Sequence, residues 1–330
     1  MLSFAIASVL LGSQALACCI VSPGEEVLMT HENVVIVWDE KAKVQHFIRQ
    51  ANFDSQAKNF GFIVPTPSVP EFSVARKEAF SLLQDLVPPP RKFGCESPTE
   101  GVAASAGATG EVEVLKEEQV GDYQATVVKA TDGQALNDWL KKNGFVSRPA
   151  MTEWLDGYTT KQWVFTALKY KAKQKSLYKP DRDSTTRTNA IRISFKTDRP
   201  HYPYKMPKDT WPEGHNRPLK LYFVAANEID AKYVDTSDHW EAKKEWSGPL
   251  PESKRIALAV DIGLKESDLP ANAQVTIFEN GRNENGYDED LIFVAASNVG
   301  TYLGGGIVVV LVGAWLMVQR NRRRFVPTAA

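Results

Sequence analysis

The stretch with the most ligand chemistry in this sequence is the polar loop at residues 280–290. Its candidate ligands are Asn283, Asn285, Asp288 and Asp290. Calcium prefers hard oxygen ligands of this kind on a glycine-containing loop, although the spacing differs from that of an EF-hand. The alternative is a polar hairpin loop that joins strands at 275–278 and 291–296, with glycines for positive φ. We prefer the hairpin loop, so no metal site is predicted here.

Histidine and cysteine form no recognisable catalytic or metal-binding motif. Three of the five histidines, His201, His215 and His239, could meet only through folding, and their spacing is no zinc signature. His46 falls in an expected strand and is interpreted as half-buried rather than catalytic. A nucleophilic Cys95 would need a base that the sequence does not place. The nucleophile elbow, the zinc-binding His-Glu-x-x-His and the phosphate loop are also missing, so no catalytic residue and no cofactor is predicted.

Short apolar runs predict a chain dominated by β-strands. Continuous or alternating apolar residues indicate strands at 34–38, 44–53, 60–64, 111–119, 123–130, 162–171, 190–195, 219–226, 256–261, 275–278 and 291–296. Polar turns after Trp38 and Gln119 predict two hairpins. The expected fold is therefore α+β, mostly antiparallel sheet with a few helices.

Helical spacing of apolar residues predicts three helices. Residues 71–87 carry an apolar stripe that ends at three prolines, and this stripe is expected in the core. Asp132 is a predicted N-cap for a helix at 133–142, and Gly144 provides the left-handed end. A further helix is predicted at 149–158, with Met151 and Trp154 facing inward.

The C-terminal region predicts a membrane anchor. Residues 299–318 contain no charged side chain and would form about 30 Å of helix, enough to cross a bilayer core. Four arginines follow in the tail at 319–330, and such clusters stay in the cytoplasm. We expect one transmembrane helix, with everything before it outside the cytoplasm.

The N-terminal segment, residues 1–17, resembles a signal peptide. It has an apolar core and the small-x-small pattern Ala15-Leu16-Ala17, although the usual basic start is missing. Cleavage after Ala17 by the general signal peptidase is favoured. The alternative is a lipoprotein in which lipid is attached to Cys18.

Charge and composition narrow the range of partners. The net charge is −1, so without the four tail arginines the remainder is mildly acidic, which argues against nucleic acid. Residues 169–187 are basic and are interpreted as a solvated loop, with an anionic envelope glycan as the alternative. Residues 94–110 are rich in Ala, Gly, Ser and Thr and predict a mobile loop.

Five segments of the chain carry a family resemblance: the Cys18-Cys19 start, 59–67 (NFGFIVPTP), 112–123 (VEVLKEEQVGDY), 130–145 (ATDGQALNDWLKKNGF) and 193–203 (ISFKTDRPHYP). They resemble a bacterial family called domain of unknown function 2330. The resemblance is spread over residues 18–226 and weakens towards 296. It implies an extracytoplasmic bacterial protein with no assigned activity, and no site residue follows from it.

These observations predict an ectodomain on a membrane anchor. We expect an N-terminal sheet-and-helix part at 18–185 and a C-terminal sheet-rich part at 186–298. The leading hypothesis is a binding or structural module of the bacterial cell envelope, with a protein or glycan partner. The alternative is an unrecognised envelope hydrolase or protein-modifying enzyme.

The first testable prediction is a disulfide bond between Cys19 and Cys95. A secreted chain enters an oxidising compartment, and adjacent cysteines rarely satisfy disulfide geometry with each other. Cys18 is the alternative partner of Cys95, but Cys19 stays available even if lipid is attached to Cys18. Closing this loop would stabilise the fold by about 4 kcal/mol in the chain-entropy model. Non-reducing peptide mapping should recover a linked peptide; Cys95 recovered wholly as a free thiol would contradict the prediction.

Overall fold

The computed structural model describes residues 27–55, 61–88, 111–145, 147–170, 185–187, 189–208, 219–280 and 288–296. The described residues through Val294 form one unit. The cysteines, the segments 1–17 and 94–110, and residues 299–330 lie outside the described part. Among the described helices, none has the length and apolar character needed to span a membrane.

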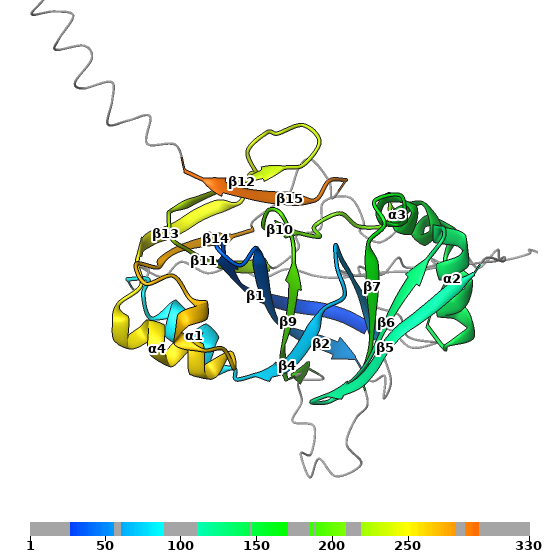
Figure 1. The fold of residues 1–330 in the computed structure, drawn as a ribbon, viewed down its shortest axis with the longest axis horizontal. Coiled ribbons are helices and arrows are strands. Elements are labelled where there is room, and N and C mark those ends of the chain that lie inside the picture. The colour runs from blue at the N-terminus through cyan, green and yellow to red at the C-terminus, as the bar shows by residue number, and fades with distance from the viewer. Residues whose placement is uncertain are drawn as a thin grey trace, which may run out of the picture. The chain divides into compact units, whose positions relative to one another are not determined.

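The largest element is an eight-stranded sheet (Figure 1). Its order is β13-β14-β11-β1-β2-β9-β4, and β8 pairs with β2 beside β9. The strands are β1 Val27–Asp39, β2 Val44–Ser55, β4 Glu71–Ala75, β8 Thr185–Arg187, β9 Ala190–Lys196, β11 Leu219–Ala225, β13 Lys243–Pro249 and β14 Gln274–Glu279. Only the central pair, β1 with β11, is parallel. The prediction of a mostly antiparallel α+β fold is confirmed.

Two smaller sheets complete the strand framework. One has the order β3-β7-β6-β5 and the other β10-β15-β12. Their strands are β3 Gly61–Thr66, β5 Val112–Val120, β6 Tyr123–Ala130, β7 Val164–Tyr170, β10 His201–Tyr202, β12 Ile229–Tyr233 and β15 Leu291–Ala295. The predicted hairpins β1–β2 and β5–β6 are present with antiparallel register.

Four α-helices and one 3-10 turn are described. They are α1 Glu78–Gln84, α2 Gly133–Lys142, α3 Pro149–Thr159, α4 Glu252–Asp261 and η1 Glu266–Asp268. Helices α1 and α4 pack on one face of the eight-stranded sheet, while α2 and α3 cover the four-stranded sheet (Figure 1). Asp132 Oδ1 accepts from the Ala135 N–H at 2.7 Å, and Gly144 has φ 77°, so both predicted ends of α2 are confirmed.

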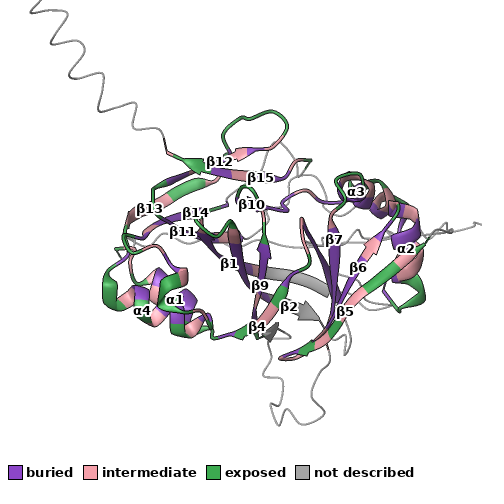
Figure 2. Ribbon diagram, in the orientation of Figure 1, coloured by how far each residue is buried: buried purple, intermediate pink, exposed green. Residues whose placement is uncertain are grey.

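Strand β1 separates the two largest cores. Val34, Ile36 and Trp38 face the smaller sheets, while Val35 and Val37 face α1 and α4. The alternation follows from the two-residue period of a strand. Figure 2 shows that the central strands are mostly buried, whereas exposed residues lie on the outer side of α4, on the turns and on the edge strands β5 and β13.

The single helix predicted at 71–87 is wrong. Residues Glu71–Ala75 instead form β4, which pairs with β9, and the helix is only Glu78–Gln84. The Arg76 N–H donates to the Asp261 carbonyl at 2.8 Å where the two elements meet. An edge of β9 available for pairing overrides helical spacing, because local propensity is a weak constraint.

The strand predicted at 256–261 is also wrong, since these residues belong to α4. Its buried residues Arg255, Leu258 and Ala259 follow helical spacing rather than alternation. Pro251 precedes the helix, and Glu252 lies in its first turn, where a negative charge is favourable.

Residues 280–290 do not join a hairpin. Strand β14 pairs with β11 and β13, whereas β15 belongs to the three-stranded sheet with β10 and β12. The division predicted near residue 185 cuts across one sheet, because β2 pairs with β9 and β1 with β11.

A buried ion pair connects β1 and β2 on the face opposite the helices. Arg49 Nε donates to Glu32 Oε1 at 2.6 Å, and the two side chains are 2% and 0% exposed. The Arg49 guanidinium also lies 4.2 Å from the ring centre of Phe62 on β3. The pair therefore links the large sheet to the four-stranded sheet.

We predict that Arg49→Met destabilises the fold by about 3–5 kcal/mol, because it leaves the Glu32 carboxylate buried without its countercharge. Urea unfolding followed by tryptophan fluorescence measures the change. The double variant Glu32→Leu/Arg49→Met should recover a large part of the loss. If the double variant is as unstable as Arg49→Met, the buried charge is not the cause.

Candidate functional site

The helix-facing side of the large sheet changes from apolar to polar along its strands. On β1, Val37 and Val35 are followed towards the strand start by Asn33 and His31 on the same face. On β11, Val224 and Tyr222 give way to Lys220, and on β14 Ile277 gives way to Glu279. Apolar residues lie under the helices, and polar residues lie beyond them.

These polar residues are aligned across four neighbouring strands. Glu279 of β14 pairs with Lys220 of β11, Lys220 pairs with Asn33 of β1, and Asn33 pairs with Gln50 of β2. We call Glu279, Lys220, Asn33 and Gln50 the polar row. Neighbouring strands are about 4.8 Å apart, so the row extends over about 14 Å.

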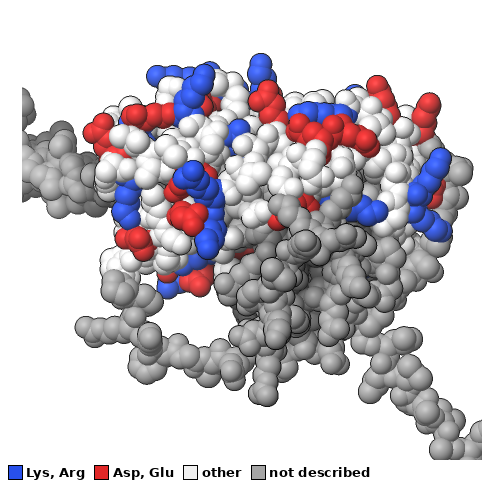
Figure 3. Space-filling view, turned by 90° about the horizontal axis from the view of Figure 1, so that it is seen from below, with Lys and Arg blue, Asp and Glu red and all other residues white. Residues whose placement is uncertain are grey.

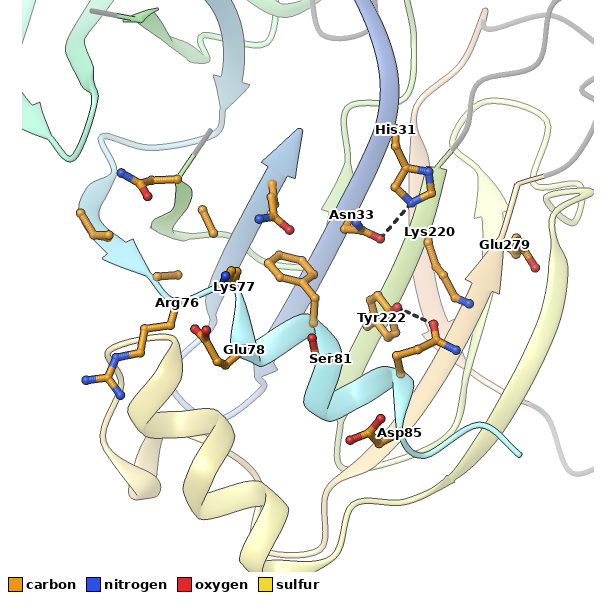
Figure 4. Close-up of a pocket in the computed structure, with 17 residues that line it drawn as sticks. His31, Asn33, Arg76, Lys77, Glu78, Ser81, Asp85, Lys220, Tyr222 and Glu279 are labelled. Atoms are coloured by element: carbon orange, nitrogen blue, oxygen red, sulfur yellow. Dashed lines mark hydrogen bonds between the residues drawn. The ribbon is translucent and has the colours of Figure 1, made fainter. Parts of the chain in front are cut away.

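The polar row forms the floor of a groove whose wall is α1 (Figure 4). The groove has a volume of about 1110 Å³. The helix side contributes Phe80, Ser81 and Gln84, and Asp85 follows the helix. Floor and wall come from segments far apart in the chain, which only the sheet topology brings together.

Two hydrogen bonds organise the groove (Figure 4). His31 Nε2 lies 3.2 Å from Asn33 Oδ1, and the Tyr222 hydroxyl donates to Gln84 Oε1 at 2.9 Å. Burial, together with the nearby Glu245 and Glu279 carboxylates, raises the pKa of Tyr222 well above its usual value. Tyr222 therefore stays protonated and ties α1 to the floor as a hydrogen-bond donor.

The charges of the groove are mixed. Lys220 Nζ forms an ion pair with Glu245 Oε2 at 2.6 Å, so its charge is offset inside the sheet. Arg76 is paired with Asp261 at 3.6 Å, while Glu279 and Asp85 are exposed. On the face shown in Figure 3, basic side chains also lie beside acidic ones. No described part of the groove presents a strong basic patch.

The structure does not bring the scattered histidines together. His46 is buried with Nδ1 2.8 Å from Ser194 Oγ, and His201 packs between Trp163 and Phe195. His239 is exposed beside β12, and His215 lies outside the described residues. Within the described part of the chain, no group of three His, Cys, Asp or Glu residues could hold a metal ion.

Asp290, a candidate calcium ligand, is already used inside the protein. Its Oδ1 accepts from the Tyr158 hydroxyl at 2.8 Å and from the Lys205 N–H at 3.1 Å. Burial raises the pKa of this carboxyl above its usual value. Asp288 is exposed, while Asn283 and Asn285 lie outside the described residues.

None of the polar row was singled out by sequence reasoning. The sequence does contain a signal for this row. In β1, every second residue faces the helices, and on that face the apolar residues are replaced by Asn33 and His31. In β11, Lys220 replaces an apolar residue in the same way. Recognising the row requires the register of four strands, and two of them follow β1 at a long distance in the sequence.

Comparison with known families decides where the chain belongs. Residues 12–271 match the family described as an uncharacterized protein conserved in bacteria (DUF2330). The chain belongs to this family. The matched region of this DUF2330 protein includes all of the polar row except Glu279. No curated protein matches the chain.

The buried histidines predict that stability falls in acid. Burial, the largest cause in both, lowers the pKa of His46 and of His201 from 6.5 to about 4. Below pH 6.5 the unfolded chain binds protons that the folded chain does not, so stability declines from pH 6.5 towards pH 4. The expected loss is about 3 kcal/mol per histidine.

Urea unfolding at a series of pH values measures this loss. The raised pKa of Asp290 acts in the opposite direction, since the folded form takes up that proton first. The comparison is therefore made between the natural chain and His46→Gln, which keeps a polar partner for Ser194. A flatter pH dependence in His46→Gln supports the assignment, and an unchanged slope contradicts it.

Proposed function

We propose that this DUF2330 protein is a membrane-anchored, extracytoplasmic binding module that holds an envelope partner, a protein or a glycan, in the groove between α1 and the polar row. The signal-like segment 1–17, the uncharged segment 299–318 and the arginine-rich tail support the location. The groove supports the binding role.

The observation that carries the proposal is the polar row itself. Among the described residues, the side chains of Gln50 and Glu279 have no hydrogen-bond partner, and both line the groove. The carbonyl oxygen of Asn33 contacts His31, and no other described residue uses its amide donors. Polar groups aligned in a groove and not consumed by the fold are suited to orienting a ligand.

The groove chemistry favours binding over the hydrolase alternative. Among the described lining residues, His31 is bonded to Asn33 rather than to Ser81, the serine of the wall, so this pair is not an activated nucleophile. The hydrogen-bonded pair His46 and Ser194 is buried outside the groove lining, and the pKa of His46 near 4 makes it a weak base at neutral pH.

The proposal is tested by cross-linking in living cells of the bacterium that makes the protein. Ser81, exposed on the groove wall, is replaced by the photo-cross-linking residue p-benzoylphenylalanine. Illumination should give an adduct of higher mass, because a bound partner lies within reach of α1. Protease added outside spheroplasts should digest that adduct, since the groove is expected outside the cytoplasm.

A matched control places the same cross-linker at Ile256, which is 41% exposed on α4 and does not line the groove. Ile256 should give no equivalent adduct. The double variant Asn33→Asp/Gln50→Ala should reduce the adduct from Ser81. Equal cross-linking from both positions, or an adduct protected from external protease, would contradict the proposal.

A further inference from the structure

We infer that the groove takes a linear oligosaccharide of neutral or amine-bearing sugars, lying across the strands along the polar row. This inference rests on the proposed function, because it names the chemical class that the same groove would hold. It adds an orientation, a length and a charge preference.

The spacing of the polar row fits a saccharide better than a peptide. Its four side chains stand on adjacent strands, one about every 4.8 Å. This is close to the repeat of one pyranose ring in an extended, equatorially linked chain. An extended peptide repeats every 3.3 Å or so, and its side chains alternate, so it falls out of step with the row. About three rings span the row, and the groove volume of about 1110 Å³ accommodates a ligand of that size.

The strands that carry the row also disfavour addition of a peptide strand. Strands β14, β11, β1 and β2 are all interior to the sheet, so their backbone groups are paired with neighbouring strands. A peptide that joins a sheet needs a free edge. The strands of the floor therefore contact a ligand through their side chains.

The side chains present match sugar hydroxyl and amide groups. Asn33 and Gln50 on the floor and Gln84 on the wall carry amides, which both donate and accept. Sugar hydroxyls do the same, and each lost hydrogen bond is worth about tenfold in affinity at most sites. Phe80 and Tyr222 contact each other with ring centres 6.4 Å apart, but both rings are buried, so the polar side chains carry the contacts to the sugar.

Charge narrows the class of sugar. Lys220 is neutralised by Glu245, whereas the Glu279 carboxylate is exposed at one end of the polar row (Figure 4). The Glu279 end therefore repels carboxylate-bearing or phosphate-bearing glycans and attracts an amine. Neutral rings are accepted along the amides, and an amino sugar is preferred near Glu279.

The experiment uses the purified full chain in a detergent without sugar headgroups. Isothermal titration calorimetry compares three named probes: the trimer of N-acetylglucosamine, the trimer of glucosamine and the trimer of galacturonic acid. The first two should bind, and the galacturonic acid trimer should bind at least about tenfold more weakly. Glu279→Gln should reduce this discrimination against the acidic trimer.

Variants test whether binding occurs on the polar row. Asn33→Asp keeps the oxygen that His31 contacts but removes the amide donors, so the fold is preserved and binding of the neutral trimer should fall about tenfold. Gln50→Ala should have a similar effect. The control Asn227→Ala removes an exposed amide outside the groove and should bind as the natural chain does. Circular dichroism confirms that each variant is folded.

The outcomes separate this inference from the proposed function. If no trimer binds but Ser81 still cross-links to a partner in cells, the sugar class is wrong and the groove keeps its binding role. Preferential binding of an extended lysine-containing peptide of four residues overturns the sugar assignment as well. If neither trimers nor cross-links are found, the proposed function fails together with the inference.

Discussion

The covering of strand β1 is the constraint on which the rest of the structure depends. From Val34 to Trp38 the strand is buried on both faces, between the smaller sheets on one side and α1 and α4 on the other. Among the described residues, Asn33 and His31 on the helix-facing side are only half-buried, whereas Glu32 on the other side is fully buried. The half-buried side is polar, because a contiguous apolar face left in water promotes association. The groove is thus a consequence of helices that cover only part of a sheet face.

The buried ion pair fixes the register of β1 against β2, and so determines which residues of β1 lie on each face of the sheet. Glu32 lies between His31 and Asn33 in sequence and points to the opposite side, where Arg49 of β2 meets it. A one-residue slip of β1 against β2 would turn Glu32 towards the helices and Asn33 into the core. The cost of burying an unpaired charge disfavours that slip. The ion pair between Glu32 and Arg49 on the opposite face therefore stabilises the alignment of Asn33 with Gln50 on the groove floor.

Local features were predictable from sequence, and long-range ones were not. The β1–β2 and β5–β6 hairpins, the Asp132 cap and α3 follow from alternation, turn residues and helical spacing within short windows. The sequence predicts a helix where β4 lies and a strand where α4 lies. A short apolar run is compatible with either structure, and its tertiary contacts determine which one forms. The polar row could not be found, since it depends on the parallel pairing of β1 with β11.

The groove wall depends on its floor. Helix α1 has seven residues and no side-chain cap, and a helix this short is not stable alone in water. Burial of Ala79, Phe80 and Leu83 holds it on the sheet, and the Tyr222 hydroxyl fixes Gln84 at its last turn. A phenol and an amide both keep their protons in acid, so this bond does not titrate in the pH range where the buried His46 and His201 must stay neutral at a cost in stability. Acid therefore removes the wall from the floor by weakening the sheet to which α1 is attached, and not by breaking the bond between Tyr222 and Gln84.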